Sequence, residues 1–330
     1  MKSTHYLTFI FVLFSTTAFC KTDYQIKGFS EKYTGLISIE EGSQDEVFNN
    51  GSISIIEAST GKSIITIYSK GLTLEADTTA KTTPLQLPYD KQRFFIAQDF
   101  NFDNITDFAI RDGRNSCYGG PSYQVYLQTE SGLEHSEEFT KLAQNYCGMF
   151  DVDYKTQTIH TSTKSGCCEH EYSTFKVDKN KPVVMEIVKS DFIINSVLER
   201  HIKKTRIENQ MLEREYNTLR DDLDLTLIYS LTFKGGKTME LFHWKADKEY
   251  LVYIFKNKSE EIELAYSGEF IFNKNEQTLT FTKHKTMYQI YNDGIAVKLP
   301  KRTTNLKADA INNTALSSVL EIAFSNLEIK

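Results

Sequence analysis

Apolar and polar residues alternate in short runs through most of the chain. The runs lie at 36–41, 51–58, 63–71, 93–99, 122–129 and 158–165, and again at 225–233, 238–246, 249–257, 261–268, 269–275, 278–284 and 287–294. Gly, Asn, Asp and Ser residues separate them. Because successive side chains of a strand point to opposite faces, this period of two predicts antiparallel strands joined by turns.

The segment 195–224 fits two structures. Its charged residues could coat a helix whose apolar stripe is Leu198, Ile202, Met211 and Leu219. Equally, two strands could form a hairpin around the turn at 208–210, and periodicity alone does not separate these alternatives. We favour the hairpin.

The pattern as a whole predicts an all-β, mainly antiparallel chain in two parts. We place a β-rich meander domain at 21–220 and a second, smaller β-rich domain of unknown role at 221–330.

Residues 1–20 have the features of a secretory signal peptide. Lys2 is followed by an apolar run at 6–14 and then by small residues. The apolar run is too short to span a membrane. The alternative is a lipid anchor at Cys20, although the bulky Phe19 precedes it. No other run approaches about 18 apolar residues, so no transmembrane segment is predicted in the mature chain.

Composition narrows the possible partners. The chain has 330 residues, of which 40% are hydrophobic and 12% aromatic, so it can form a substantial core rich in strands. Its formal charge of -6 argues against nucleic acid, whose phosphates require a basic face. A basic protein partner would be attracted instead.

Removal of the leader leaves four cysteines, Cys117, Cys147, Cys167 and Cys168. An even number in an exported protein favours disulfides over free buried thiols. Since adjacent residues do not easily reach disulfide geometry, we expect Cys167 and Cys168 each to pair with Cys117 or Cys147, in an order that the sequence leaves open.

An acidic turn lies between two apolar runs. It has side-chain oxygens at Asp99, Asn101, Asp103 and Asp107, and Ile105 can add its main-chain carbonyl. Hard oxygen ligands at this spacing suit Ca²⁺, which takes 6–8 of them. We therefore predict a structural Ca²⁺ that pins two strands, with a plain solvated turn as the alternative.

Two loops near the cysteines, at 115–127 and 165–175, carry tyrosines. Their candidate contact residues are Tyr118, Tyr123, Ser165, Gly166, His170 and Tyr172. These loops could simply cap a sheet. As rigid loops that present aromatic and hydroxyl groups, they would also suit insertion into the cleft of a protein partner.

Catalytic motifs are weak. The chain contains neither Gly-x-Ser-x-Gly nor His-Glu-x-x-His, and the Ser-x-x-Lys match at 173–176 lacks its partner motifs. Cys167, Cys168 and His170 are too few for a zinc site. The sequence therefore predicts a protein that is not an enzyme.

The order of these motifs resembles a family of exported bacterial proteins. The resemblance covers roughly residues 90–190 and rests on DFNFDNITDFAI, YGGPSYQVYL, FTKLAQ, SGCCEHEYSTF and KPVVMEIV. Members of that family are periplasmic immunity proteins with a β-propeller-like fold. They bind Ca²⁺ and inhibit lysozyme-like effectors delivered by type IV secretion systems of competing bacteria.

The resemblance implies a periplasmic inhibitor of a lysozyme-like muramidase. Asp99, Asn101, Asp103 and Asp107 would bind the Ca²⁺, and the loop at 165–175 would enter the target's active site. The alternative is a non-catalytic, β-rich binding module of the cell envelope. The resemblance does not cover residues 221–330.

Overall fold

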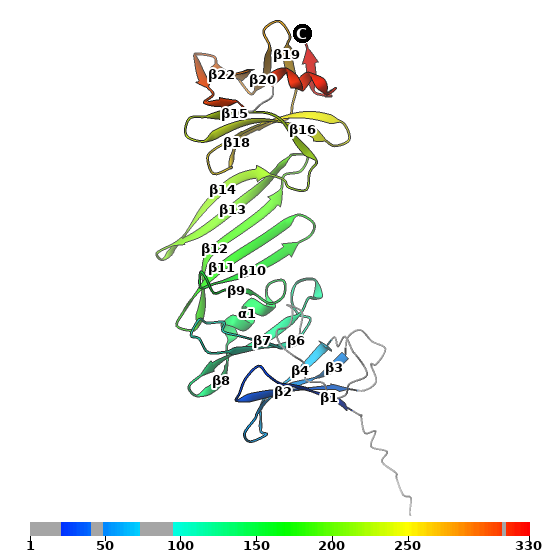
Figure 1. Cartoon of the computed structure of the whole chain (residues 1–330), viewed down its shortest axis with the longest axis vertical. Coiled ribbons are helices and arrows are strands. Elements are labelled where there is room, and N and C mark those ends of the chain that lie inside the picture. Colours follow the sequence, from blue (N-terminus) through cyan, green and yellow to red (C-terminus); the bar gives the residue numbers. More distant parts are fainter. Residues whose placement is uncertain (1–20, 41–48, 73–94, 312–314) are drawn as a thin grey trace, which may run out of the picture. The chain divides into compact units, whose positions relative to one another are not determined.

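The structure is a computed structural model that describes residues 21–40, 49–72, 95–311 and 315–330 (Figure 1). The described residues form five sheets, and most strands pair with their neighbours in sequence. Wherever the register is described, the pairs are antiparallel, except that β19 (Phe270–Asn273) and β25 (Leu327–Ile329) are parallel. The prediction of an all-β, mainly antiparallel fold is confirmed. The predicted signal peptide at 1–20 and the alternative anchor Cys20 lie outside the described residues.

The described sheets do not form a propeller. The meander is therefore the better description, and the β-propeller-like arrangement implied by the resemblance is wrong for the described part of the chain. A propeller needs repeated blades around one axis, whereas these sheets differ in strand number and several pack in face-to-face layers.

The chain divides into two compact units. Unit 1 comprises residues up to 163 together with 174–184, and unit 2 comprises 164–173 together with 185–330. The predicted domain boundary at 220/221 falls inside unit 2, between β14 (Gln210–Leu219) and β15 (Leu225–Phe233).

Unit 1 contains two four-stranded meanders. The first has β1 (Lys21–Ile26), β2 (Tyr33–Glu40), β3 (Asn49–Glu57) and β4 (Ser63–Leu72). The second has β5 (Phe95–Gln98), β6 (Asp107–Gly113), β7 (Ser122–Thr129) and β8 (Gly132–His135). A 3-10 turn, η1 (Cys117–Gly119), precedes β7, and the helix α1 (Glu137–Gln144) follows β8.

Both faces of the second meander are covered. One face contributes Phe95, Phe108 and Ile110 to a core shared with β1–β4. The other face packs on α1, which begins at the N-cap Ser136 and buries Phe139 and Leu142. The turn that precedes β6 and the loop that precedes β7 are thus anchored in a closely packed scaffold.

A six-stranded sheet contributes residues to both units. Its order is β14-β13-β12-β11-β10-β9. The strands are β9 (Asp151–Asp153), β10 (Thr158–Ser165), β11 (Glu169–Asp178), β12 (Lys181–Phe192), β13 (Leu198–Ile207) and β14 (Gln210–Leu219). The segment 195–224 contains the hairpin β13–β14, so the hairpin prediction is confirmed.

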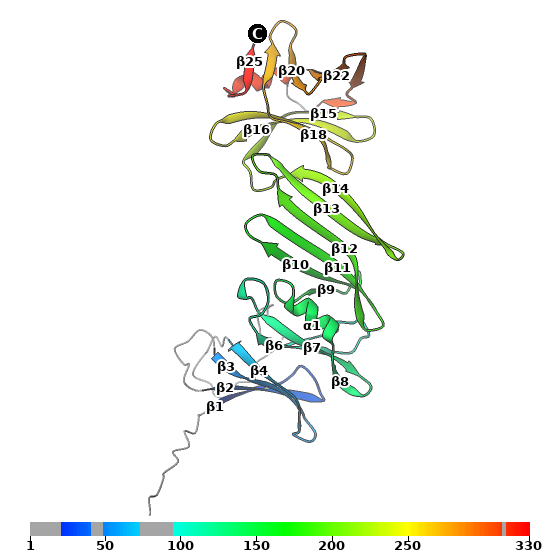
Figure 2. The same ribbon diagram turned by 180° about the vertical axis from the view of Figure 1, so that it is seen from behind.

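Part of this sheet has no hydrophobic core on either face. Among the described residues, no hydrophobic cluster includes a member from 186–192 or 199–218. These parts of β12, β13 and β14 form a single layer in both views (Figures 1 and 2). Continuous hydrogen-bonded pairing joins the strands. Ion pairs such as Lys203–Glu186 at 2.7 Å cross between them, although such exposed pairs are each worth at most about 1 kcal/mol.

Unit 2 also contains two sheets packed face to face around one core. The first has the order β18-β17-β16-β15-β24 and the second has β23-β22-β21-β20-β19-β25. The strands of the first are β15 (Leu225–Phe233), β16 (Lys237–Lys245), β17 (Glu249–Lys256), β18 (Ile262–Tyr266) and β24 (Ala310–Ile311). The second sheet has β19 (Phe270–Asn273), β20 (Thr278–Lys283), β21 (Thr286–Tyr291), β22 (Gly294–Leu299), β23 (Arg302–Lys307) and β25 (Leu327–Ile329), and η2 (Leu316–Glu321) packs against the core.

No helix in the described parts of the chain has the length and apolar character needed to cross a membrane.

Asn326 links several strands of unit 2 through a buried amide. It is 4% exposed, accepts a hydrogen bond from the Leu251 amide, and donates to the carbonyls of Leu251, Ser267 and Gly268.

Asn326→Ala should lower the free energy of unfolding by about 2–4 kcal/mol, because it leaves buried backbone groups without partners. Urea denaturation measures this. The exposed Asn305 is the matched control, and its replacement by Ala should change stability by no more than about 0.5 kcal/mol. Equal losses would contradict the assignment.

Candidate functional site

The acidic turn connects β5 and β6, and hydrogen bonds close it. The Asp99 carboxylate accepts the amides of Asp103 and Asn104 at 3.1 and 2.8 Å, and Asp103 accepts the Ile105 amide at 2.8 Å. Asn104 has a φ of 66°, the left-handed conformation that the sharp turn requires. The exposed turn is therefore shaped by its own carboxylates.

Asp107 differs from the other two acids because it is fully buried. Its carboxylate accepts the backbone amides of Phe100 at 2.8 Å and of Gln128 at 2.9 Å, which ties the turn to β7. The pKa of Asp107 is raised to about 7. Burial is the main cause, the two amide hydrogen bonds oppose it, and the nearby charges of Asp103 and Asp99 add a smaller increase.

The donor set suits a hard cation, since it consists of carboxylate, amide and carbonyl oxygens. However, the described residues contain no group of three or more His, Cys, Asp or Glu side chains that could hold a metal ion in their present positions. Hydrogen bonds alone account for the closed turn. Calcium binding by Asp99, Asn101, Asp103, Ile105 and Asp107 stays a prediction.

The first tyrosine loop is held by a disulfide. Cys117 bonds to Cys147, with their Cα atoms 4.8 Å apart. Gly148 donates from its amide to the Ser116 hydroxyl at 3.1 Å, which brings the two segments together. In the chain-entropy model, a bond between residues 30 apart in sequence stabilises the fold by about 3–4 kcal/mol.

The two tyrosines of this loop have opposite environments. Tyr118 is 70% exposed and has a φ of 53°, an unusual conformation for a bulky residue. Tyr123 is fully buried in the core with Val125 and Leu127. The prediction that Tyr123 contacts a partner is therefore wrong: alternation along β7 points it inward.

The second tyrosine loop is the turn Gly166–Cys168 and the adjoining ends of β10 and β11. Ser165 and Gly166 are exposed, and Gly166 has a φ of 63°. His170 is half-buried, Tyr172 is 54% exposed, and their ring centroids lie 6.4 Å apart. We call residues 165–172 the hairpin tip.

An ion pair shows which face of the sheet each side chain of the hairpin tip occupies. Glu171 contacts Lys189 of β12 at 2.9 Å, so these two side chains share one face of the sheet. His170 and Tyr172 flank Glu171 and point to the other face. That face also carries the stacked rings of His201 and Tyr216, 4.9 Å apart.

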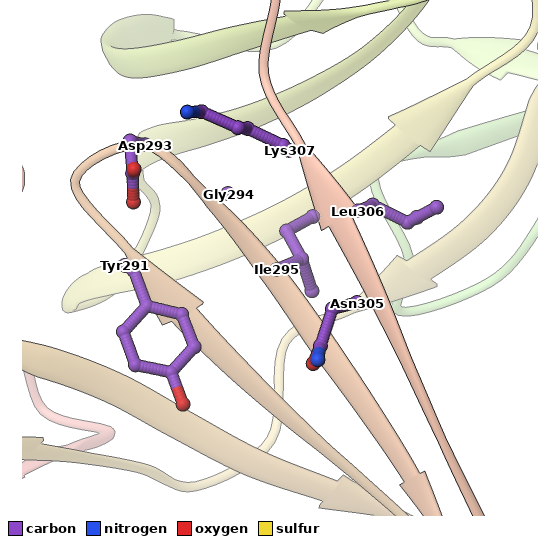
Figure 3. A pocket seen from close by; sticks show the side chains of 7 residues that line it. All are labelled: Tyr291, Asp293, Gly294, Ile295, Asn305, Leu306 and Lys307. Atoms are coloured by element: carbon purple, nitrogen blue, oxygen red, sulfur yellow. The ribbon is translucent and has the colours of Figure 1, made fainter.

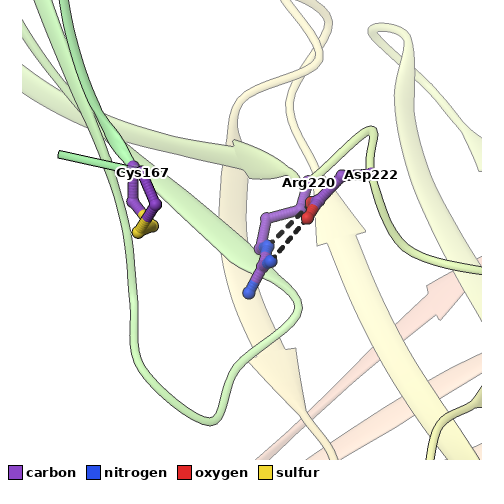
Figure 4. Close-up of a disulfide and its surroundings, with 4 residues drawn as sticks. Cys167, Arg220 and Asp222 are labelled. Carbon is purple, nitrogen blue, oxygen red and sulfur yellow. Dashed lines mark hydrogen bonds and ion pairs between the residues drawn. A yellow bond between two sulfur atoms is a disulfide. The ribbon is translucent and has the colours of Figure 1, made fainter. Parts of the chain in front are cut away.

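The predicted disulfide pairing is wrong. Cys167 bonds to Cys168 (Figure 4). Cys117 bonds to Cys147. The prediction relied on the wide Cα separation of most disulfides. Here, the Cα atoms are 3.8 Å apart within a turn, a local conformation that the general rule did not consider.

The candidate contact residues are divided between the two units. Tyr118 belongs to unit 1, whereas Ser165, Gly166, His170 and Tyr172 belong to unit 2. Each loop is thus a separate candidate site.

Sequence reasoning missed a pocket of about 320 Å³ at the turn between β21 and β22. Asp293 and Lys307 lie at one end, and the Tyr291 hydroxyl and Asn305 amide lie at the other (Figure 3). Gly294, Ile295 and Leu306 complete the lining. These polar groups do not converge on one point, so the pocket identifies no ligand.

No family model matches the chain, and no curated protein matches it. Among solved structures, it is similar to a Xanthomonas type IV secretion system related protein, with 19% identity and a TM-score of 0.44 over 58% of this chain and 92% of that one. It is also similar to polysaccharide lyase Uly1, with 8% identity and a TM-score of 0.24 over 88% of this chain and 82% of that one. The first similarity is to a protein related to the secretion system named in the resemblance. At these TM-scores, neither likeness carries an argument about function.

Asp107→Ala should destabilise the protein by about 2–4 kcal/mol in chelator, because two buried amides lose their acceptor. Asp103→Ala, at an exposed position, should cost less than about 1 kcal/mol under the same conditions. Urea denaturation distinguishes the two variants. Similar losses would contradict the structural role of Asp107.

The raised pKa of Asp107 also predicts a pH dependence. The unfolded carboxyl ionises near 3.8 and the folded one near 7, so this group's contribution to stability is present below about pH 4 and is lost as the pH rises to 7. In chelator, Asp107→Asn should abolish this loss of stability between about pH 4 and pH 7, which urea denaturation at several pH values measures. Parallel stability curves for wild type and variant would contradict the assignment.

Calcium binding has its own test. Ca²⁺ should raise the melting temperature of the wild type relative to chelator, by mass action on the folded state. Asp103→Ala should abolish this rise, since it removes a predicted ligand. An equal melting temperature for wild type with Ca²⁺ and with chelator would refute the calcium prediction.

Proposed function

We propose that this protein is a periplasmic inhibitor of a lysozyme-like muramidase that acts through the hairpin tip. The observation that carries the proposal is the placement of Tyr172, a half-exposed aromatic ring beside His170 on a tip closed by its own disulfide. Such a group needs little ordering when it enters a cleft, which keeps the entropic cost of binding small.

The chemistry of the target cleft suits these side chains. A muramidase holds two carboxyl groups on either side of the scissile bond. The Tyr172 hydroxyl and the His170 ring can donate hydrogen bonds to carboxylates, and their rings would occupy the space of the glycan. Inhibition of this kind requires no chemical step by the inhibitor.

Charge supports association with the target. The chain has a formal net charge of -6, which would attract a basic muramidase. The Cys117–Cys147 bond is consistent with export to an oxidising compartment. In this proposal, the Ca²⁺ predicted at the acidic turn has a structural role only.

Inhibition can be tested by the loss of turbidity of bacterial cells. The wild type at stoichiometric concentration should block one or more muramidases of a panel, and Tyr172→Ala should raise the inhibition constant at least tenfold, as expected for a central aromatic contact. Tyr68→Ala is the matched control, since Tyr68 is 51% exposed on β4, outside both loops.

Two results would overturn parts of this proposal. An unchanged inhibition constant for Tyr172→Ala, with a raised one for Tyr118→Ala, would move the contact to the loop at η1. Absence of inhibition across the whole panel would refute the inhibitor function.

We propose one alternative, a non-catalytic binding module of the cell envelope. The part of the six-stranded sheet that has no hydrophobic core favours this alternative, because aromatic rings such as His201 and Tyr216 lie on its face. This alternative predicts sedimentation with purified cell walls, without muramidase inhibition. Tyr216→Ala should then reduce the amount that sediments.

A further inference from the structure

The Cys167–Cys168 disulfide joins no separate parts of the fold. The two residues are neighbours in the chain, with Cα atoms 3.8 Å apart, at the end of the β10–β11 hairpin. Cys167 is exposed. In Figure 4 the surroundings of this disulfide include the ion pair of Arg220 with Asp222, at 2.7 Å. Because Cys167 is exposed, a dissolved thiol can approach its sulfur, which is the first requirement for thiol–disulfide exchange.

The Cys117–Cys147 disulfide has a different setting. Both of its residues are half-buried, and they lie 30 residues apart in sequence. Cys147 donates from its amide to the Ser162 carbonyl at 2.8 Å, and Gly120 donates to the Cys117 carbonyl at 2.9 Å. The Gly148 amide also donates to the Ser116 hydroxyl at 3.1 Å, which links the residues next to the two cysteines. If the disulfide opened, this contact would keep the two sulfurs near each other, so the bond would re-form.

Reduction of the Cys167–Cys168 bond has no comparable cost to the fold. Because the bond closes no loop between distant residues, opening it releases no chain segment. Reduced neighbours are also free to adopt ordinary backbone conformations, which rarely bring adjacent cysteine sulfurs together. The oxidised and reduced chains should therefore share the same fold and differ at the turn.

We propose that Cys167–Cys168 is a reversible redox-modification site whose reductant is a dithiol. A thiolate of the dithiol attacks the exposed Cys167 sulfur, the sulfur–sulfur bond breaks, and the Cys168 thiolate leaves. The second thiol of the reductant then attacks the mixed disulfide and releases the Cys167 thiolate. The protein gains two electrons and, after protonation, two hydrogens; the dithiol loses both and becomes a cyclic disulfide.

The modification controls the shape of the hairpin tip. The disulfide closes a small ring that contains the peptide bond between Cys167 and Cys168 and so restricts their backbone torsions. His170 and Tyr172 lie two and four residues after Cys168, on the adjoining strand β11. After reduction, the turn is flexible in the free protein, so binding to a partner must pay the entropic cost of ordering it. This part of the inference rests on the proposed function, and it predicts about tenfold weaker inhibition by the reduced protein.

Selective reduction is tested on the full, folded chain. The protein is incubated with increasing dithiothreitol, alkylated with iodoacetamide, digested and analysed by mass spectrometry. Cys167 and Cys168 should be alkylated at dithiothreitol concentrations at least tenfold lower than Cys117 and Cys147. Reduction of both bonds together, or of Cys117–Cys147 first, would overturn the proposal. Oxidised glutathione should restore the Cys167–Cys168 bond, and failure to re-form it would refute reversibility.

Hydrogen exchange gives a readout that needs no target enzyme. Backbone amides of 165–172 should exchange several-fold faster after selective reduction, while those of β13 and β14 remain unchanged. The double variant Cys167→Ser/Cys168→Ser should reproduce the fast exchange, ignore dithiothreitol, and melt within about 2 °C of the wild type. Unchanged exchange in 165–172 would overturn the effect on the tip.

Cys117→Ser/Cys147→Ser is the matched control, and it should lower the melting temperature clearly, because its bond closes a long loop. Equal thermal losses for the two double variants would overturn the distinction between the disulfides. A protein that inhibits no muramidase in either redox state would refute the proposed function, whereas the alkylation order would still decide the redox site.

Discussion

Antiparallel pairing between strands adjacent in sequence is the constraint on which the rest of the structure depends. It creates each hairpin locally and satisfies most of the backbone hydrogen bonds of the described strands, whereas β24 and β25 pair with strands distant in sequence. It also allows β12–β14 to form a layer without a core over residues 186–192 and 199–218. In that layer, alternating charges on the edge strand, such as Glu213, Arg214 and Glu215, would discourage pairing with other chains.

The same pairing determines where the candidate contact groups lie. β10 and β11 carry the hairpin tip at their ends, and alternation along β11 places Tyr172 on the face opposite to the Glu171–Lys189 ion pair. In unit 1, the buried Asp107 carboxylate and the Cys117–Cys147 bond anchor the acidic turn and the η1 loop. Rigid β scaffolds with short closed loops thus present the exposed aromatic groups in both units.

Much of the strand pattern could be predicted because one face of most strands is buried. Alternation found β15 at 225–233 with its observed bounds. β12 was missed, because VVMEIV is half-buried throughout and shows no alternation. The helix α1 has only eight residues, too few for a distinct helical period.

The candidate site was less predictable than the fold. The burial of Tyr123 could be predicted from the sequence, because alternation along β7 places it on the same face as Val125 and Leu127. The Cys167–Cys168 bond was not, because it depends on the local backbone of one turn and not on any sequence period. The hydrogen bonds that close the acidic turn could not be predicted from the spacing of its oxygen ligands, because they depend on the local backbone conformation of the turn.

The central claim is that the hairpin tip is the surface that enters a muramidase. Hydrogen exchange of the protein with and without an inhibited muramidase tests it most directly. Amides of 165–172 should become protected in the complex, while those of the η1 loop and of β21–β23 exchange as before. Protection elsewhere, with unchanged exchange at 165–172, would contradict the account.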